Sequence, residues 1–98
     1  MHVIVWEFEA RAGKETEFEK AYGSSGDWAM LFAESPDYRG TDLLKSITDR
    51  TYLTVDRWTS AAAFAEFKQR WHAEYTALDQ RMESLTQRER SIGQYESA

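Results

Sequence analysis

Four residues that could position a small molecule alternate along the segment TYLTVDRW: Tyr52, Thr54, Asp56 and Trp58. Side chains of a β-strand point alternately to its two faces, so these four share one face. Polar groups between buried aromatic side chains need hydrogen-bond partners, and we therefore expect Tyr52 and Asp56 to orient a substrate. In the alternative interpretation, which the sequence favours for Asp56, this carboxylate pairs with a nearby arginine and Trp58 packs beneath a helix.

His72 is the third candidate catalytic residue because an imidazole beside Trp71 is a natural general base if it faces a pocket. It lies about 100° around the helix from Trp71, which favours a solvated or rim position. Metal ligation would need further ligands one helical turn away. The residues three and four positions from His72 are Lys68, Gln69, Tyr75 and Thr76. None is a carboxylate, so we predict no metal site.

Aromatic residues make up 14% of the chain and include four tryptophans. Such side chains can line an apolar cleft between a sheet and its helices. The candidate pocket residues are Trp6, Trp28, Trp58, Phe64, Phe67 and Trp71. For any single one of them the alternative is a place in the ordinary core, which is the commoner role of a buried aromatic side chain.

The strands and helices that position these residues are predicted from the spacing of apolar side chains and from the Gly and Pro residues that interrupt it. Strands are predicted at His2–Glu9, Tyr38–Thr48, Thr51–Trp58 and Arg88–Glu96, with a turn at Asp49-Arg50 and a bulge or close approach at Gly93. Helices are predicted at Lys14–Tyr22, from Asp27 as cap to before Pro36, and at Ala61–Leu85 after a Thr59 or Ser60 cap, with a bend near His72 to Thr76. The order predicts an α+β, ferredoxin-like βαββαβ antiparallel sheet with its helices on one face.

The strands carry apolar residues on both faces. Val3 and Val5 lie opposite Ile4, Trp6 and Phe8. Leaving about half a dozen such side chains in water would forfeit on the order of 10 kcal/mol, which is comparable with the whole stability of a small domain. We therefore expect a homodimer in which a second copy covers the open sheet face.

Length and charge limit the function classes. A chain of 98 residues forms one domain, here residues 1–98, and its net charge of -5 argues against nucleic acid as a partner. No apolar run is long enough for a membrane span, and we expect a cytoplasmic protein. With no cysteine and no phosphate-binding glycine motif, we expect no cofactor.

The sequence resembles the antibiotic biosynthesis monooxygenase (ABM) family of the dimeric α+β barrel superfamily. The resemblance is carried by Trp6-Glu7-Phe8, Gly13-Lys14, Tyr22-Gly23, Gly26-Asp27-Trp28, Leu31-Phe32, Tyr38-Arg39-Gly40-Thr41, Leu43-Leu44, Tyr52 to Trp58 with Ser60, and Phe64 with Phe67. It implies two ferredoxin-like subunits packed sheet against sheet. It also implies a cofactor-independent monooxygenase that oxidises an aromatic, polyketide or quinol-like small molecule with dioxygen.

Two alternatives to this activity stay open at the level of sequence. The same pocket would serve a non-catalytic dimeric domain that binds a hydrophobic small molecule. Haem-degrading relatives use an asparagine on the first strand and a tryptophan and a histidine on the second helix. Glu7 and Phe67 stand at the first two of these positions here, and His72 alone does not make up for these two departures.

Overall fold

The computed structural model describes residues 1–98, and its strands and helices follow one another in the predicted order. The four strands are β1 (His2–Ala10), β2 (Tyr38–Lys45), β3 (Thr51–Trp58) and β4 (Thr86–Glu96). The helices are α1 (Glu15–Tyr22), α2 (Asp27–Phe32), α3 (Ala61–Arg70) and α4 (His72–Met82), followed by the 3₁₀ turn η1 (Glu83–Leu85).

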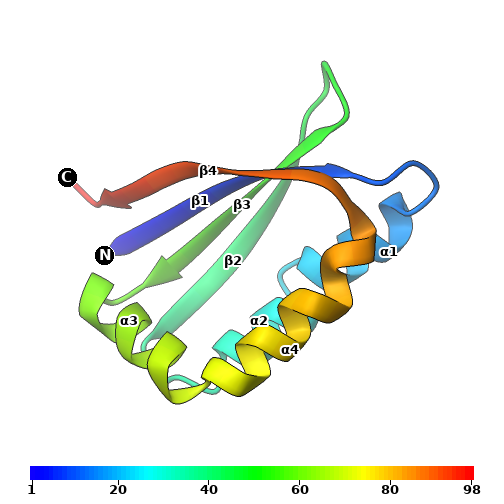
Figure 1. Ribbon diagram of the computed structural model, residues 1–98. Coiled ribbons are helices and arrows are strands. Elements are labelled where there is room, and N and C mark those ends of the chain that lie inside the picture. The colour runs from blue at the N-terminus through cyan, green and yellow to red at the C-terminus, as the bar shows by residue number, and fades with distance from the viewer.

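The strands form one antiparallel sheet in the order β2-β3-β1-β4. Figure 1 shows all helices below this sheet, on the same face, and both chain termini at one end of it. The predicted α+β ferredoxin-like fold is therefore confirmed. The figure shows a single chain, with the second face of the sheet uncovered.

The long predicted helix is broken, and the break comes one residue before the expected window. Trp71 leaves helical geometry, with φ −106° and ψ 27°, and separates α3 from α4. A straight helix from Ala61 to Leu85 would be about 38 Å long. The longest dimension of the molecule is 36 Å, so the chain turns at Trp71 to keep both halves against the sheet.

The hairpin between β2 and β3 differs from the prediction. β2 ends at Lys45 and a five-residue loop replaces the expected two-residue turn. Local side-chain hydrogen bonds explain the difference, because they give the backbone an alternative to the strand ladder. The Ser46 hydroxyl accepts from the amides of Thr48 and Asp49, and the Asp49 carboxylate accepts from the amide of Thr51 at 2.9 Å.

β4 contains the irregularity that its glycine predicts. Its register with β1 shifts between Val5 and Trp6, which leaves Ile92 as an extra residue beside Gly93. Gly93 has φ +155°, and a Cβ there would lie 2.9 Å from the Tyr95 hydroxyl. Only glycine combines this backbone conformation with the ring of Tyr95 lying over it.

The two short helices meet at a second close approach. A Cβ on Gly26 would lie 2.4 Å from the carbonyl oxygens of Lys20 and Ala21, so the start of α2 packs directly on the end of α1. Gly26 is also the N-cap of α2. The prediction that Asp27 caps this helix is therefore wrong: Asp27 lies in the first turn and accepts from Arg81 at 2.8 Å. Ser60 caps α3 as predicted, through its contact with the Ala63 amide.

Two hydrophobic clusters form the core between the sheet and the helices. One lies near α1 and α4 and includes Phe8, Phe18 and Tyr52. The other lies near α3 and includes Trp58 and Phe67, which contact each other with ring centroids 5.1 Å apart. The gap between the two clusters is where the cavity forms.

Candidate functional site

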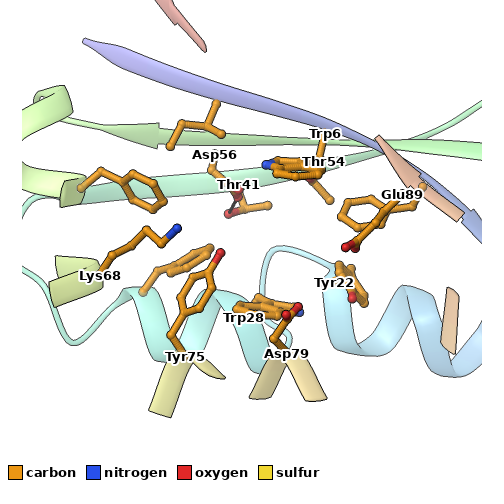
Figure 2. Close-up of a pocket in the computed structure, with 14 residues that line it drawn as sticks. Trp6, Tyr22, Trp28, Thr41, Thr54, Asp56, Lys68, Tyr75, Asp79 and Glu89 are labelled. Atoms are coloured by element: carbon orange, nitrogen blue, oxygen red, sulfur yellow. Dashed lines mark hydrogen bonds between the residues drawn. The ribbon is translucent and has the colours of Figure 1, made fainter. Parts of the chain in front are cut away.

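A cavity of about 290 Å³ lies between the sheet and the helices, where the two core clusters are bridged by aromatic rings. Its residues come from every strand and from helices α1 to α4 (Figure 2). They are Ile4, Trp6, Phe8, Tyr22, Trp28, Phe32, Thr41, Thr54, Asp56, Phe64, Lys68, Tyr75, Asp79 and Glu89. The sheet contributes short polar side chains at Thr41, Thr54 and Asp56, which leave room that larger apolar residues would fill.

Asp56 is at the centre of a short hydrogen-bond chain in this cavity. Thr41, its cross-strand neighbour, donates to an Asp56 carboxylate oxygen at 2.6 Å. Because the Thr41 proton is used there, the Tyr38 hydroxyl is the donor in its 2.5 Å contact with Thr41. Burial raises the pKa of Asp56 to about 6, and the Thr41 hydrogen bond and the charge of Arg57 limit that rise. The carboxylate is thus a proton acceptor close to neutral pH.

Tyr75 and Lys68 lie across the cavity from this carboxylate. Figure 2 shows the Tyr75 hydroxyl and the Lys68 ammonium directed from the helices toward the sheet. Burial, followed by the charges of Asp79 and Asp56, raises the pKa of Tyr75 to about 12, so its hydroxyl stays protonated. The Lys68 ammonium lies 4.9 Å from the centre of the Tyr75 ring and makes no ion pair.

Three of the six predicted pocket residues line the cavity: Trp6, Trp28 and Phe64. The other three lie in or beside the core. Trp58 and Phe67 are 0% and 3% exposed and pack within the second cluster, and Trp71 packs against that cluster at the helix break. Their side chains hold α3 against the sheet.

The three predicted catalytic residues are not brought together. Asp56 lines the cavity, but Tyr52 lies four residues away along β3, which is about 13 Å, beneath α1. The Tyr52 hydroxyl donates to Glu19 at 2.6 Å, and its ring contacts Phe18. His72 is exposed at the start of α4 and lies outside the cavity lining.

The same geometry places the charged neighbours of Asp56 relative to the two sheet faces. Asp56 has no arginine partner, because Arg57 points to the other sheet face and pairs with Asp42 at 2.7 Å. Glu7 also lies on that face, 3.1 Å from Arg90, and not in the cavity. No group of three or more His, Cys, Asp or Glu side chains is arranged to hold a metal ion. No helix has the length and apolar character to cross a membrane.

Tyr75, Lys68 and Glu89 line the cavity although the sequence does not predict it. Tyr75 is an aromatic residue within the long predicted helix, and its place opposite Asp56 depends on the break at Trp71, which redirects α4. Lys68 and Glu89 are ordinary charged residues in the sequence. A single charge at a strand or helix position predicts solvent exposure, and only the fold shows which charges border a cavity.

The fold defines an α+β domain of the ferredoxin-like class, with a half-open cavity between the sheet and the helices. The sequence profile of the antibiotic biosynthesis monooxygenase family matches residues 1–81. The chain therefore belongs to this family. No curated protein sequence matches the chain.

Solved structures show the same fold at low identity. SnoaB, described as a cofactor-independent oxygenase from Streptomyces nogalater, superposes with a TM-score of 0.71 at 18% identity over 99% of this chain and 92% of its own. A putative antibiotic biosynthesis monooxygenase from Bordetella bronchiseptica gives 0.74 at 16% identity over 99% and 96% of the two chains. A NIPSNAP domain protein from Burkholderia xenovorans gives 0.72 at 20% identity over 100% and 95%.

Proposed function

We propose that this protein is a cofactor-independent monooxygenase that oxidises an aromatic, polyketide or quinol-like small molecule with dioxygen. The observation that carries the proposal is the Asp56 carboxylate, with its pKa raised to about 6, in a cavity lined by aromatic rings. Membership of the monooxygenase family supports the reaction class. The likeness to SnoaB supports the fold alone, since identity is 18%.

Asp56 acts as the general base in this proposal. A carboxylate whose pKa lies near the working pH is largely ionised and yet more basic than an exposed aspartate. It removes a proton from a C–H or O–H group of a ring held between Trp6 and Trp28. Thr41 keeps the carboxylate in place and, through Tyr38, connects it to the end of the sheet.

Tyr75 and Lys68 stabilise the anion that proton removal creates. The developing charge spreads onto the oxygen of the aromatic substrate, opposite Asp56. A protonated hydroxyl and an ammonium group facing that oxygen favour the anion electrostatically, and the apolar walls strengthen the effect by limiting water. Ring packing positions both groups. The Lys68 ammonium lies over the Tyr75 ring, and the ring centroids of Tyr75 and Trp28 are 5.1 Å apart.

The anion then supplies the electrons that dioxygen needs. For a methylene between aromatic rings, a C–O bond forms between the carbanion and dioxygen to give a peroxide. Asp56 returns its proton to the peroxide and becomes a carboxylate again. It then removes the remaining C–H proton while the O–O bond breaks, so one oxygen becomes a carbonyl and the other leaves as hydroxide. The hydroxide takes up a proton from Asp56 and becomes water. The balance is one methylene and one dioxygen converted to one ketone and one water.

A homodimer is part of the proposal. The open face of the sheet carries the apolar side chains Val3, Val5, Leu44, Leu53, Val55 and Tyr95. Leu44 and Tyr95 are 51% and 50% exposed in the single chain. A second copy packed on this face would bury both side chains. The cytoplasmic location stays a prediction from the sequence.

Oxygen uptake with a panel of hydroquinones and anthrones tests the activity, on protein shown to be free of metal and flavin. We expect uptake that depends on the folded protein and falls with Asp56→Asn. Uptake no faster than a heat-treated control, together with tight binding of the same compounds, would favour the non-catalytic binding domain. A Soret band after addition of haemin would instead favour the haem-binding alternative.

A further inference from the structure

Thr54 is a buried polar residue to which the proposed reaction gives no role. It is 5% exposed and lies in the middle of β3. Its side chain lines the cavity on the sheet side, beside Trp6 of the neighbouring strand (Figure 2). The side-chain hydrogen bonds of this part of the sheet join Tyr38, Thr41 and Asp56, and none of them engages the Thr54 hydroxyl.

Thr41 is the matched case of a hydroxyl that has partners on the same sheet face. It is 7% exposed, accepts from Tyr38 and donates to Asp56. Thr54 is as deeply buried, and each of these threonines lines the cavity. Thr54 therefore differs from Thr41 in its missing partner and not in its burial.

The neighbours of Thr54 in the sheet cannot supply that partner. In the strand register Thr54 lies between Trp6 on β1 and Leu43 on β2. The indole of tryptophan is a donor only, and leucine has no polar atom, so neither side chain accepts a proton. A buried hydroxyl without a partner is unfavourable, and valine would fill the same space without that cost. A molecule bound in the cavity would supply the missing acceptor.

The distance between Thr54 and Asp56 indicates which part of a ligand Thr54 reaches. The two residues are two positions apart on one face of β3, which is about 7 Å along the strand. A ring system between Trp6 and Trp28 whose reactive position lies at Asp56 therefore extends past Thr54. The Asp56 carboxylate would repel an anion at that place, whereas a neutral oxygen accepts a proton from the threonine without this penalty.

We propose that Thr54 is a specificity-determining residue that donates a hydrogen bond to a second, neutral oxygen substituent of the aromatic ligand. The proposal rests on the proposed function only in taking the cavity as the binding site of an aromatic molecule. One ligand oxygen then faces Tyr75 and Lys68 and becomes anionic, and the other stays neutral beside Thr54. The substrate class is accordingly an aromatic compound with oxygen substituents at two separate ring positions.

Binding of three matched naphthalene probes tests this contact without any requirement for turnover. The probes are 2-naphthol, 7-methyl-2-naphthol and naphthalene-2,7-diol, so the second oxygen is absent, replaced by a methyl group, or present. Their fluorescence is titrated with the intact protein in the absence of dioxygen, which prevents oxidation of the probes.

Thr54→Val should bind the diol about fivefold more weakly than the wild type does, because one hydrogen bond is lost. It should bind the methyl compound no more weakly than the wild type does. Thr54→Ser keeps the hydroxyl and should keep the affinity for the diol. The control Thr76→Val removes a hydroxyl from an exposed position of α4 outside the cavity and should bind all three probes as the wild type does.

Urea denaturation in the absence of any probe separates this role from a structural one. The Thr54 hydroxyl has no partner within the chain, so Thr54→Val should be at least as stable as the wild type. A clear loss of stability would show that the hydroxyl serves the fold and would overturn the proposal.

The titrations provide two further outcomes that count against the contact. An unchanged affinity of Thr54→Val for the diol would overturn it, and so would an equal loss of affinity for the diol and the methyl compound. Either result leaves the aromatic site of the proposed function intact, because the probes still bind the wild type. Failure of all three probes to bind the wild type would contradict both the contact and that aromatic site.

Discussion

Thr41 and Asp56 face each other across β2 and β3, and the Thr41 hydroxyl donates to the Asp56 carboxylate at 2.6 Å. The contact places a hydrogen-bonded acid on the sheet floor of an aromatic cavity. A hydrogen bond to the charged form of an acid lowers its pKa, whereas burial raises it. The two effects together leave the pKa of Asp56 at about 6.

Thr41→Val should move the acid limb of the activity profile to higher pH. Valine removes the donor that lowers the pKa of Asp56, so the carboxylate stays protonated up to a higher pH and the base is inactive over a wider acidic range. The pH dependence of kcat/KM for oxygen uptake measures this shift. Tyr38→Phe, which leaves the Thr41–Asp56 contact intact, should move the limb less, and an unmoved limb in Thr41→Val would refute the role given to this bond.

Asp56→Asn should stabilise the protein at neutral pH. The folded-state pKa of Asp56 is raised from 3.8 to about 6, so its stabilising contribution is complete below pH 3.8 and is lost as the pH rises through about 6. Asparagine has no charge to bury. The free energy of unfolding of the variant should exceed that of the wild type by about 2 kcal/mol at pH 7.5, less than the full shift implies because water enters the cavity.

The comparison at acidic pH is the control for that prediction. Near pH 4 the wild-type carboxyl is protonated and uncharged in the folded state, so urea denaturation should give nearly equal stabilities for the two proteins. A stability difference that is the same at pH 4 and pH 7.5 would show that ionisation of Asp56 is not its cause.

Gly26→Ala should destabilise the fold by about 2–3 kcal/mol. The new Cβ would meet the carbonyl oxygens of Lys20 and Ala21 at 2.4 Å, and backbone atoms must then move apart. Chemical denaturation of the variant and of Ser25→Ala, at the exposed neighbouring position, measures the difference. Equal free energies of unfolding for the two variants would mean that α1 and α2 can move apart without destabilising the fold.

Val55→Lys should convert the proposed dimer to a monomer. Val55 lies near the middle of the open sheet face, opposite Val5 on β1 and Asp42 on β2, and a lysine there would place a charge inside the dimer interface. Sedimentation velocity should give a dimer for the wild type and a monomer for the variant. Ala73→Lys on the exposed side of α4 is the control and should remain a dimer, whereas a monomeric wild type would contradict the covered sheet face.

The sequence predicted the order of elements because each carries a clear period, and the residues of β3 were assigned to the correct common face. Tyr52 and Asp56 show the limit of that reasoning. Strand period fixes their face but not what covers each end of the strand, and here α1 covers Tyr52 while the cavity opens over Asp56. Helical spacing placed His72 on the rim, where the structure has it, but the position of Tyr75 opposite Asp56 also depends on the break at Trp71.

Product analysis after reaction of an anthrone under isotopically labelled dioxygen tests the central claim most directly, with wild-type protein, Asp56→Asn and heat-treated protein compared. We expect the wild type to form a product that carries one labelled oxygen atom in each molecule. We expect Asp56→Asn to form this product about a hundredfold or more slowly. The urea denaturation described above shows whether the variant is folded. Label incorporation at equal rates in wild type and Asp56→Asn, or no incorporation above the heat-treated control, would contradict the central claim.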